Sequence, residues 1–261
     1  LMNKEISINN ESKIIWKNNP IAKLKRGNDY LNPELDIIAD DSLSTESKTK
    51  LIKFLSKWLR DYINEVLGDL IKLTKHEIKN QYLRGLVFQL YESNGVIKRS
   101  DVDKIVKSIP VEERKKLWGM GIKIGRYHIY LPKMLKPKAV EFRISLWKIF
   151  HNFSSKNEIP KSGLNFLISK NLDKNFLLLC GFEKFKEFFV RIDILEKLFL
   201  KIIGNSKEKK FKINSEMMNL LGCSKENFYK LMTYMNYKKD KAADTYVFKG
   251  EKKKKKENIT I

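Results

Sequence analysis

The sequence has little of what disulfide-rich or membrane-spanning proteins need. Its 261 residues include only two cysteines and six prolines. Two cysteines cannot build a disulfide framework or a cysteine-rich zinc site, so we expect reduced thiols and a reducing compartment. No apolar run approaches the roughly 20 residues that a membrane helix needs, and the N-terminus has no signal-peptide pattern. The sequence therefore predicts a cytoplasmic protein with no membrane partner.

Catalytic motifs are missing as well. The sequence contains no G-x-x-x-x-G-K-[ST] phosphate loop and no G-x-S-x-G nucleophile turn. The three histidines lie far apart without partners at metal-ligand spacing, which argues against a metal site. The glycines of 119–125 are spaced one residue too widely for a dinucleotide fingerprint. We therefore expect no catalytic residue, metal site or cofactor in this chain.

Positive charge is abundant. Lysine and arginine number 53 against 31 acidic residues, so the formal net charge is +22, and only eight of the basic residues are arginine. Such a balance favours a polyanionic partner, above all a nucleic acid. A lysine-rich surface without a specific partner is the alternative, because lysine, asparagine and isoleucine are together enriched wherever the coding DNA is rich in A and T.

Hydrophobic periodicity predicts a mainly α fold with small β elements. Apolar residues recur at three and four over 45–73, the pattern of a long amphipathic helix. Short strands and turns are expected over 1–40 and a β-hairpin or bent strand over 122–131. Further helices are expected over 77–93, 101–110, 112–118, 137–150, 173–180, 192–203, 215–221 and 225–235. No internal repeat of fixed period is visible.

Composition divides the chain into five parts. A strand-and-turn segment covers 1–40, a helical domain with the hairpin covers 41–150, and a linker with helices covers 151–210. A compact unit follows over 211–250, and a lysine-rich tail that we expect to be disordered closes the chain over 251–261.

The compact unit near the C-terminus reads as a helix-turn-helix or winged helix. Asn214 caps a first helix, a glycine-containing turn follows, and Ser224 caps a second helix that leads to a strand at 246–248. Three polar residues of the second helix stand where a recognition helix presents side chains, namely Lys225, Asn227 and Lys230. The alternative is that this unit packs on protein rather than on nucleic acid.

The segment 123–138 mixes cations and aromatic residues densely. Lysine and arginine side chains neutralise phosphates, and aromatic rings stack on unpaired bases. The candidate phosphate ligands are Lys123, Arg126, Lys133, Lys136 and Lys138, and the candidate ring contacts are Tyr127, His128 and Tyr130. The alternative is a solvated hairpin whose aromatic residues belong to the core.

Several strings together resemble one family. They are IIW and PIAKL within 14–24, RGLVFQL at 84–90, GIKIGRYHIYLP at 121–132, VRIDILE at 190–196 and MM with LLGCS within 217–224. This set resembles the C-terminal region of alphaproteobacterial superfamily 2 helicases, which are similar to the RNA helicase of the mitochondrial degradosome. Asn18 stands where that family usually has glycine.

The resemblance implies a function that no motif of this chain shows. The chain would be the C-terminal nucleic-acid-binding accessory region of an ATP-dependent RNA or DNA helicase, gripping the translocating strand. ATP, magnesium and the hydrolase activity would belong to RecA-like motor domains upstream of Leu1. The partners would be single-stranded RNA or DNA, the motor domains and a nuclease. Two alternatives remain: a module that docks a nuclease or ribosomal protein, and a stand-alone DNA-binding regulator.

Overall fold

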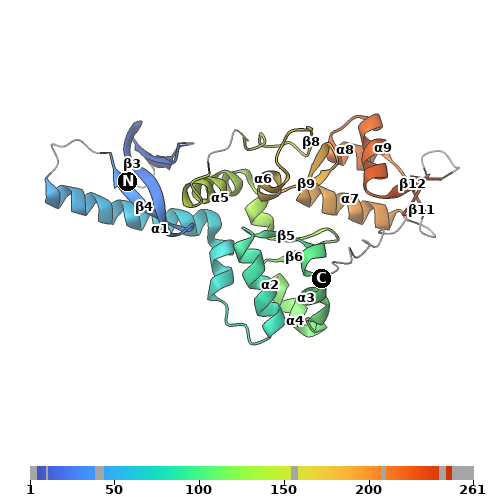
Figure 1. Cartoon of the computed structure of the whole chain (residues 1–261), viewed down its shortest axis with the longest axis horizontal. Helices are drawn as coiled ribbons and strands as arrows, with labels where there is room; N and C mark the ends of the chain where they lie inside the picture. The colour runs from blue at the N-terminus through green and yellow to red at the C-terminus, as the bar shows by residue number, and fades with distance from the viewer. Residues whose placement is uncertain are drawn as a thin grey trace, which may run out of the picture. The chain divides into compact units, whose positions relative to one another are not determined.

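The computed structural model describes residues 5–9, 11–38, 44–153, 158–206, 210–240 and 245–248 (Figure 1). Its chain divides into two compact units: unit 1 runs to Pro160 and includes Leu179–Gly181, and unit 2 holds 161–178 and the residues from Phe182 onward. Over the described residues about 51% are helical and 23% lie in strands, forming nine α-helices and four small antiparallel sheets. The prediction of a mainly α chain is therefore wrong, and the fold is mixed α/β.

Unit 1 begins with a four-stranded antiparallel sheet in the order β1-β2-β3-β4. The strands are β1 (Ile6–Ile8), β2 (Lys13–Trp16), β3 (Asn19–Asp29) and β4 (Asn32–Ile37). In β3, Ala22 and Leu24 are buried while the lysines between and after them are exposed, which is the alternation of a half-buried strand. Gly27 lies where the pairing with β4 is irregular, and a Cβ there would come within 1.9 Å of the Asn32 carbonyl oxygen.

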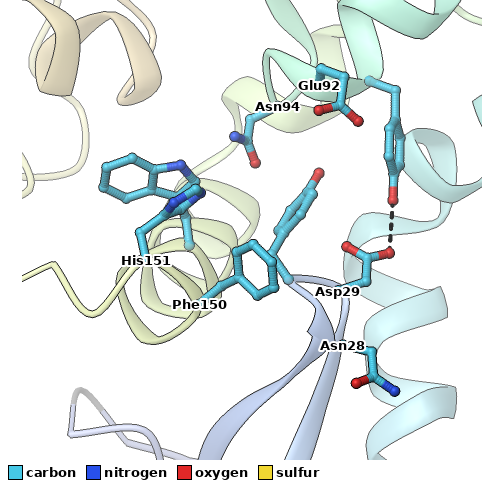
Figure 2. A pocket seen from close by; sticks show the side chains of 9 residues that line it. Asn28, Asp29, Glu92, Asn94, Phe150 and His151 are labelled. Atoms are coloured by element: carbon cyan, nitrogen blue, oxygen red, sulfur yellow. Dashed lines mark hydrogen bonds between the residues drawn. The ribbon is translucent and has the colours of Figure 1, made fainter.

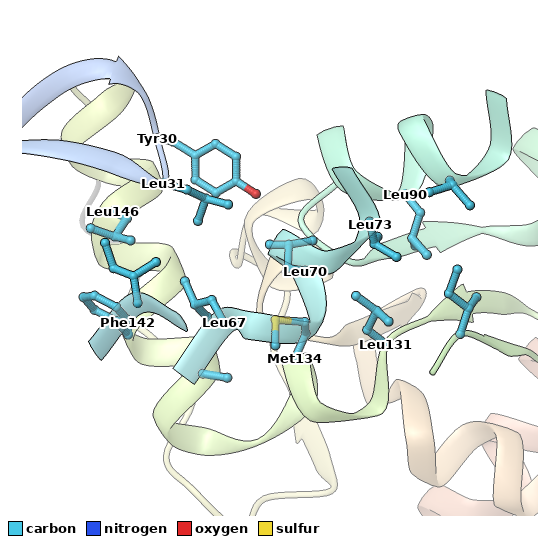
Figure 3. Packing of buried hydrophobic residues seen from close by; sticks show 14 of the residues in the cluster. Tyr30, Leu31, Leu67, Leu70, Leu73, Leu90, Leu131, Met134, Phe142 and Leu146 are labelled. Atoms are coloured by element: carbon cyan, nitrogen blue, oxygen red, sulfur yellow. The ribbon is translucent and has the colours of Figure 1, made fainter. Parts of the chain in front are cut away.

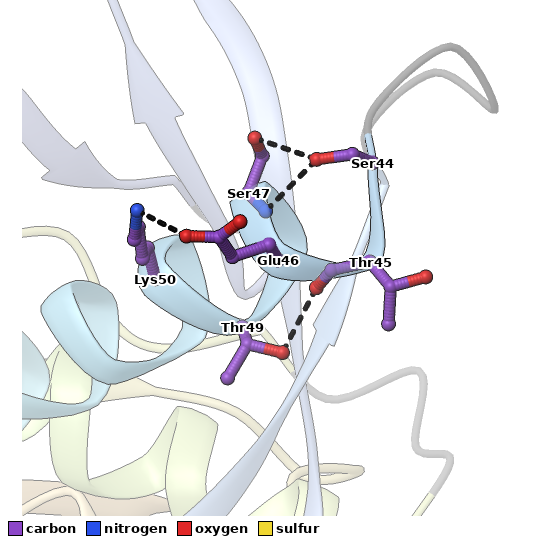
Figure 4. Close-up of polar contacts among 6 residues, drawn as sticks. All are labelled: Ser44, Thr45, Glu46, Ser47, Thr49 and Lys50. Carbon is purple, nitrogen blue, oxygen red and sulfur yellow. Dashed lines mark hydrogen bonds and ion pairs between the residues drawn. The ribbon is translucent and has the colours of Figure 1, made fainter.

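The long helix predicted after the sheet is confirmed as α1 (Thr45–Lys75). Ser44 caps it, because its hydroxyl accepts a hydrogen bond from the Ser47 backbone N–H at 3.2 Å (Figure 4). Glu46 in the first turn pairs with Lys50 at 2.6 Å. The backbone leaves helical geometry at Leu67, so α1 is kinked there.

The core of unit 1 gathers around the second half of α1. Figure 3 shows Leu67 and Leu70 of α1 meeting Met134 and Phe142, together with Leu31 from the turn of the sheet. Met134 comes from a short 3₁₀ helix, η2 (Pro132–Leu135), and Phe142 from α5 (Pro137–Phe150). A proline opens each of these two helices, as the sequence predicts for α5. The core therefore joins the sheet, α1 and α5 within one unit.

Between α1 and η2 lies a group of six elements. They are α2 (Gln81–Glu92), β5 (Val96–Lys98), α3 (Arg99–Ser108), α4 (Val111–Gly119), β6 (Lys123–Ile124) and β7 (His128–Tyr130). The strands form a sheet in the order β5-β7-β6. The pairing of β6 with β7 confirms the hairpin predicted over 122–131.

Unit 2 contains two further three-stranded sheets. The first is β8-β10-β9, and the second is β11-β13-β12. The elements of unit 2 are β8 (Phe166–Ile168), α6 (Lys174–Leu179), β9 (Phe182–Phe185), β10 (Phe188–Arg191), α7 (Ile192–Gly204), β11 (Lys210–Lys212), α8 (Ser215–Leu221), α9 (Lys225–Tyr234), β12 (Tyr237–Lys239) and β13 (Thr245–Phe248). The stretch 151–210, expected to hold a linker and helices, thus also holds three strands.

The six elements from α7 to β13 repeat the order of those from α2 to β7. Each group runs helix, strand, helix, helix, strand, strand, and each sheet has its last strand in the middle. The sequence shows no fixed period because the two groups differ in the lengths of their helices and strands. Among the described residues, no helix combines the length and apolar character that crossing a bilayer requires.

Candidate nucleic-acid interface

Two of the predicted ring contacts in unit 1 are buried. His128 on β7 has no exposed surface, and Tyr130 two residues later is 5% exposed. These residues stand opposite Lys98 and Val96 of β5, and Tyr130 also faces Lys123 of β6. A ring that the protein covers is not open to an unstacked base, so we no longer assign nucleic-acid contact to these two residues. Tyr127, in the turn between the strands, is half-buried.

The predicted cations of 123–138 do not form one row. Lys133 and Lys138 make ion pairs with α1, to Asp69 at 3.0 Å and to Glu65 at 2.9 Å. The hydrogen bond to Glu65 raises the pKa of Lys138. Lys123, Arg126 and Lys136 are exposed at other points along the segment. These two pairs fasten η2 and α5 to α1, which is a structural role for two of the five cations.

The helix predicted to present side chains in unit 2 is α9. Its N-terminus is capped as predicted, because the Ser224 hydroxyl accepts from the Asn227 backbone N–H at 3.2 Å. Phe228 and Leu231 face the core. Lys230 pairs with Glu226 at 2.7 Å, and the hydrogen bond to that carboxylate raises the pKa of Lys230. Of the three predicted residues, Lys225 is the one whose ammonium group lies beside a half-buried aromatic ring.

That ring belongs to Tyr229, which the sequence reasoning missed. The Lys225 Nζ lies 5.5 Å from the Tyr229 ring centroid, and the Lys239 Nζ of β12 lies 5.8 Å from it. The Tyr246 ring of β13 lies at a centroid distance of 6.2 Å from the Tyr229 ring. We call Lys225, Tyr229 and Lys239 the Tyr229 cluster: one half-buried aromatic ring with two ammonium groups near it.

A second ring on the same helix has a similar neighbour. The Lys186 Nζ lies 4.3 Å from the Tyr234 ring centroid, within the distance at which a cation and an aromatic ring attract. The Tyr234 hydroxyl donates to Glu187 at 3.0 Å, and this contact raises the pKa of Tyr234. The ring is thereby held in place by its hydroxyl and covered by an ammonium group.

The sheet next to α9 carries more lysines on its other face. Phe211 pairs directly with Tyr246, and their rings lie on the α9 side. Because side chains alternate along a strand, Lys210 and Lys212 point to the opposite side. Lys238, paired with Val247, shares that outer side. Lys210 makes an ion pair with Asp240 at 2.8 Å.

In unit 1, the helix that corresponds to α9 in element order is α4. Its second-last residue is Trp118, which is 73% exposed, although large aromatic residues are seldom so open to water. Lys115 and Lys116 precede it and pair with Glu112 and Glu113 at 3.0 and 2.7 Å. The exposed tryptophan is a second feature that sequence reasoning missed, because a residue at the end of a helix belongs to neither face by periodicity alone.

Comparison with known proteins returns no relative: no protein family, no curated protein and no solved structure matches this chain. The resemblance to helicase C-terminal regions therefore stays a prediction based on the short strings themselves.

Proposed function

We propose that this chain is a single-stranded nucleic-acid-binding region, and that it serves as the C-terminal accessory part of an ATP-dependent RNA or DNA helicase. The observation that carries the binding function is the Tyr229 cluster, with Lys225 at 5.5 Å and Lys239 at 5.8 Å from one ring. Ammonium groups attract phosphates, and base stacking on an aromatic ring contributes roughly 1–3 kcal/mol per base. The cluster offers both contacts at one place.

The topology supports the same function. The order of elements from α7 to β13, with the last strand in the middle of the sheet, is that of winged-helix units, and we propose this class for both six-element groups. In helix-turn-helix proteins the second helix of the motif presents side chains to nucleic acid. In the group from α7 to β13 this helix is α9, which carries Tyr229. In the group from α2 to β7 it is α4, which carries the exposed Trp118.

The helicase role rests on the resemblance of the strings. A motor that hydrolyses ATP moves a strand only if another surface holds that strand between steps. ATP and magnesium would be bound by motor domains upstream, and we propose no residue of this chain for them. Reading the coding DNA upstream of Leu1 tests this part. An open frame with a Gly-Lys-Thr loop and a DExH box supports it, and a stop codon before Met2 contradicts it.

The binding function is tested by replacing the ring. Tyr229→Ala should weaken binding of a single-stranded oligonucleotide by roughly 1–3 kcal/mol, about 5- to 150-fold, because the base loses its stacking surface. Tyr229→Phe keeps the ring and should bind like the original chain. Fluorescence anisotropy with labelled RNA and DNA strands measures both. Equal affinities of the Ala and Phe variants would show that the ring does not contact the strand.

A protein-docking function is the second candidate, favoured by α7. Leu200 and Ile203 of this helix are exposed, Leu200 at 68%. These two apolar side chains lie within one helical turn, and contiguous exposed apolar surface is where partner proteins bind. This candidate predicts that Leu200→Ser abolishes association with a partner protein while strand binding is unchanged.

A further inference from the structure

A cavity of about 420 Å³ is formed by residues of unit 1. It is bounded by the turn between β3 and β4, the end of α2 and the end of α5 (Figure 2). A volume of this order accommodates a small organic ligand. The side chains around it carry both aromatic rings and acidic groups.

Two buried polar atoms at this cavity have no hydrogen-bond partner. They are the Tyr30 hydroxyl and the Asn94 Oδ1, and their residues are 9% and 3% exposed. Figure 2 shows the Asn94 carboxamide pointing into the space between Glu92, Phe150 and His151. Buried polar groups nearly always have a partner in native structures. These two atoms are therefore groups to which a bound ligand can form hydrogen bonds.

Two carboxylates at the cavity also have no cation beside them. Asp29 accepts hydrogen bonds from the Tyr91 hydroxyl at 3.2 Å and the Leu31 N–H at 3.3 Å, and Glu92 is exposed at the end of α2. No lysine or arginine in the described part of the chain makes an ion pair with either. Unpaired carboxylates are unexpected in a chain with 53 basic residues. Because neither carboxylate has a cation beside it among the described residues, its oxygens can accept hydrogen bonds from a ligand.

Aromatic rings form the walls. The Trp147 and His151 ring centroids are 4.8 Å apart, and Phe150 meets His151 edge to face at 5.1 Å. The Arg26 guanidinium lies 5.1 Å from the Phe150 ring centroid. The cavity thus combines aromatic rings with hydrogen-bond acceptors.

We propose that this cavity binds a guanine base, with Glu92 and Asp29 accepting from its N1–H and amino group and the Tyr30 hydroxyl donating to its O6. Guanine presents two adjacent donors beside an acceptor on one edge. Adenine instead places an acceptor beside its amino group, and a carboxylate repels that acceptor. An organic cation would leave the Tyr30 hydroxyl without an acceptor.

Burial keeps the Tyr30 hydroxyl protonated, so that it can donate a hydrogen bond to the guanine O6. Loss of water around the ring raises the pKa of Tyr30 well above its usual range, so the hydroxyl retains its proton and donates at every physiological pH. The guanine could come from a free nucleotide or from a base of a bound strand. The inference stands on the cavity alone and does not require the Tyr229 cluster.

Isothermal titration calorimetry of the full chain tests the proposal with GMP, AMP, CMP and UMP, and a second arm uses an oligouridine with or without one guanosine. We expect guanine to bind at least about tenfold tighter than the other bases in one arm or both, because a pair of hydrogen bonds to one base edge discriminates to about that degree. Binding of GMP alone identifies a free nucleotide, and preference only for the guanosine-containing strand identifies a base of the strand.

Glu92→Gln and Tyr30→Phe should each reduce the guanine preference several-fold, whereas Glu46→Gln, an exposed acid on α1, should not. Because Tyr30→Phe removes only an unpaired hydroxyl, a thermal melt should show that this variant is folded. Absence of guanine preference in both arms, or equal preference in the Glu92→Gln variant, would overturn the proposal. Tyr229→Ala should lower strand affinity and leave GMP binding unchanged, so each proposal can fail without the other.

Discussion

Burial decides which single residues can contact a nucleic acid. Sequence alternation places Arg126, His128 and Tyr130 opposite Tyr127 and Ile129, but it cannot say which of these side chains the rest of the protein covers. His128 and Tyr130 turn out to be enclosed. Tyr229 stays half-buried with two lysines beside it. Lys225 and Tyr229 are one helical turn apart, a spacing visible in the sequence. Lys239 lies near the Tyr229 ring because β12 packs against α9, which the sequence does not reveal.

Arg143 is another residue whose burial the sequence does not reveal. The side chain is fully buried in unit 1 and donates to the backbone carbonyl of Leu179 at 2.7 Å and of Met134 at 3.2 Å. Loss of water lowers the pKa of this guanidinium to about 10. A charged residue of α5 is thus buried, and its two hydrogen bonds connect the helix to Leu179 and to η2. Periodicity does not reveal such a contact.

Cysteine reactivity gives a prediction at this scale. Burial raises the pKa of the Cys180 thiol to about 12 and that of Cys223 to about 11. The thiolate is the reactive form, so the alkylation rate of Cys223 by iodoacetamide should rise about tenfold per pH unit from pH 7.5 to 10. Cys180 should react only after unfolding. Mass spectrometry of the modified chain follows both sites, and a rate that levels off near pH 8.5 would contradict the assignment.

At the scale of elements, the sequence predicts helices better than sheets. The stripe of α1 and the caps at Ser44, Asn214 and Ser224 are local signals, and all are present in the structure. The sheet β8-β10-β9 was not expected, because its strands have only three or four residues. So short a strand shows no clear alternation, and β8 pairs with β10 from a distant stretch of the sequence. The mainly α prediction failed for this reason.

The N-cap of α1 can be tested by one substitution. Ser44→Ala removes the oxygen that accepts from the Ser47 N–H and should lower the free energy of unfolding by about 0.5–2 kcal/mol. Ser44→Asp keeps an acceptor and should unfold like the original chain. Urea titration followed by circular dichroism measures both variants. A loss of equal size in Ser44→Asp would mean that the cap does not contribute through its oxygen.

The pairing of β3 with β4 depends on Gly27. Gly27→Ala would place a Cβ 1.9 Å from the Asn32 carbonyl oxygen, so the strands must separate locally. We expect a loss of about 1–3 kcal/mol or more. Gly85→Ala, on α2 of the same unit, meets no atom within 4 Å and should leave stability unchanged or raise it by up to about 1 kcal/mol. Equal unfolding midpoints for the two variants would disprove the close approach at Gly27.

At the scale of the whole molecule, two features could not be read from the sequence. One is the repeated order of elements from α2 to β7 and from α7 to β13, which depends on which strands pair. The other is the cavity beside Tyr30, whose lining comes from three separate stretches of the chain. The net charge, by contrast, is a property of composition and predicts a polyanionic partner directly. The lysine-rich tail over 251–261 lies outside the described residues.

The salt dependence of strand binding tests the central claim most directly. Each phosphate that a cation neutralises on a single strand contributes about 0.7 to the slope of log affinity against log salt concentration. The double variant Lys225→Gln, Lys239→Gln should therefore flatten the slope by about 1.4. The control Lys50→Gln, Lys57→Gln on α1 removes the same charge from exposed positions and should leave the slope unchanged. Equal slopes for the two double variants would contradict a nucleic-acid contact at the Tyr229 cluster.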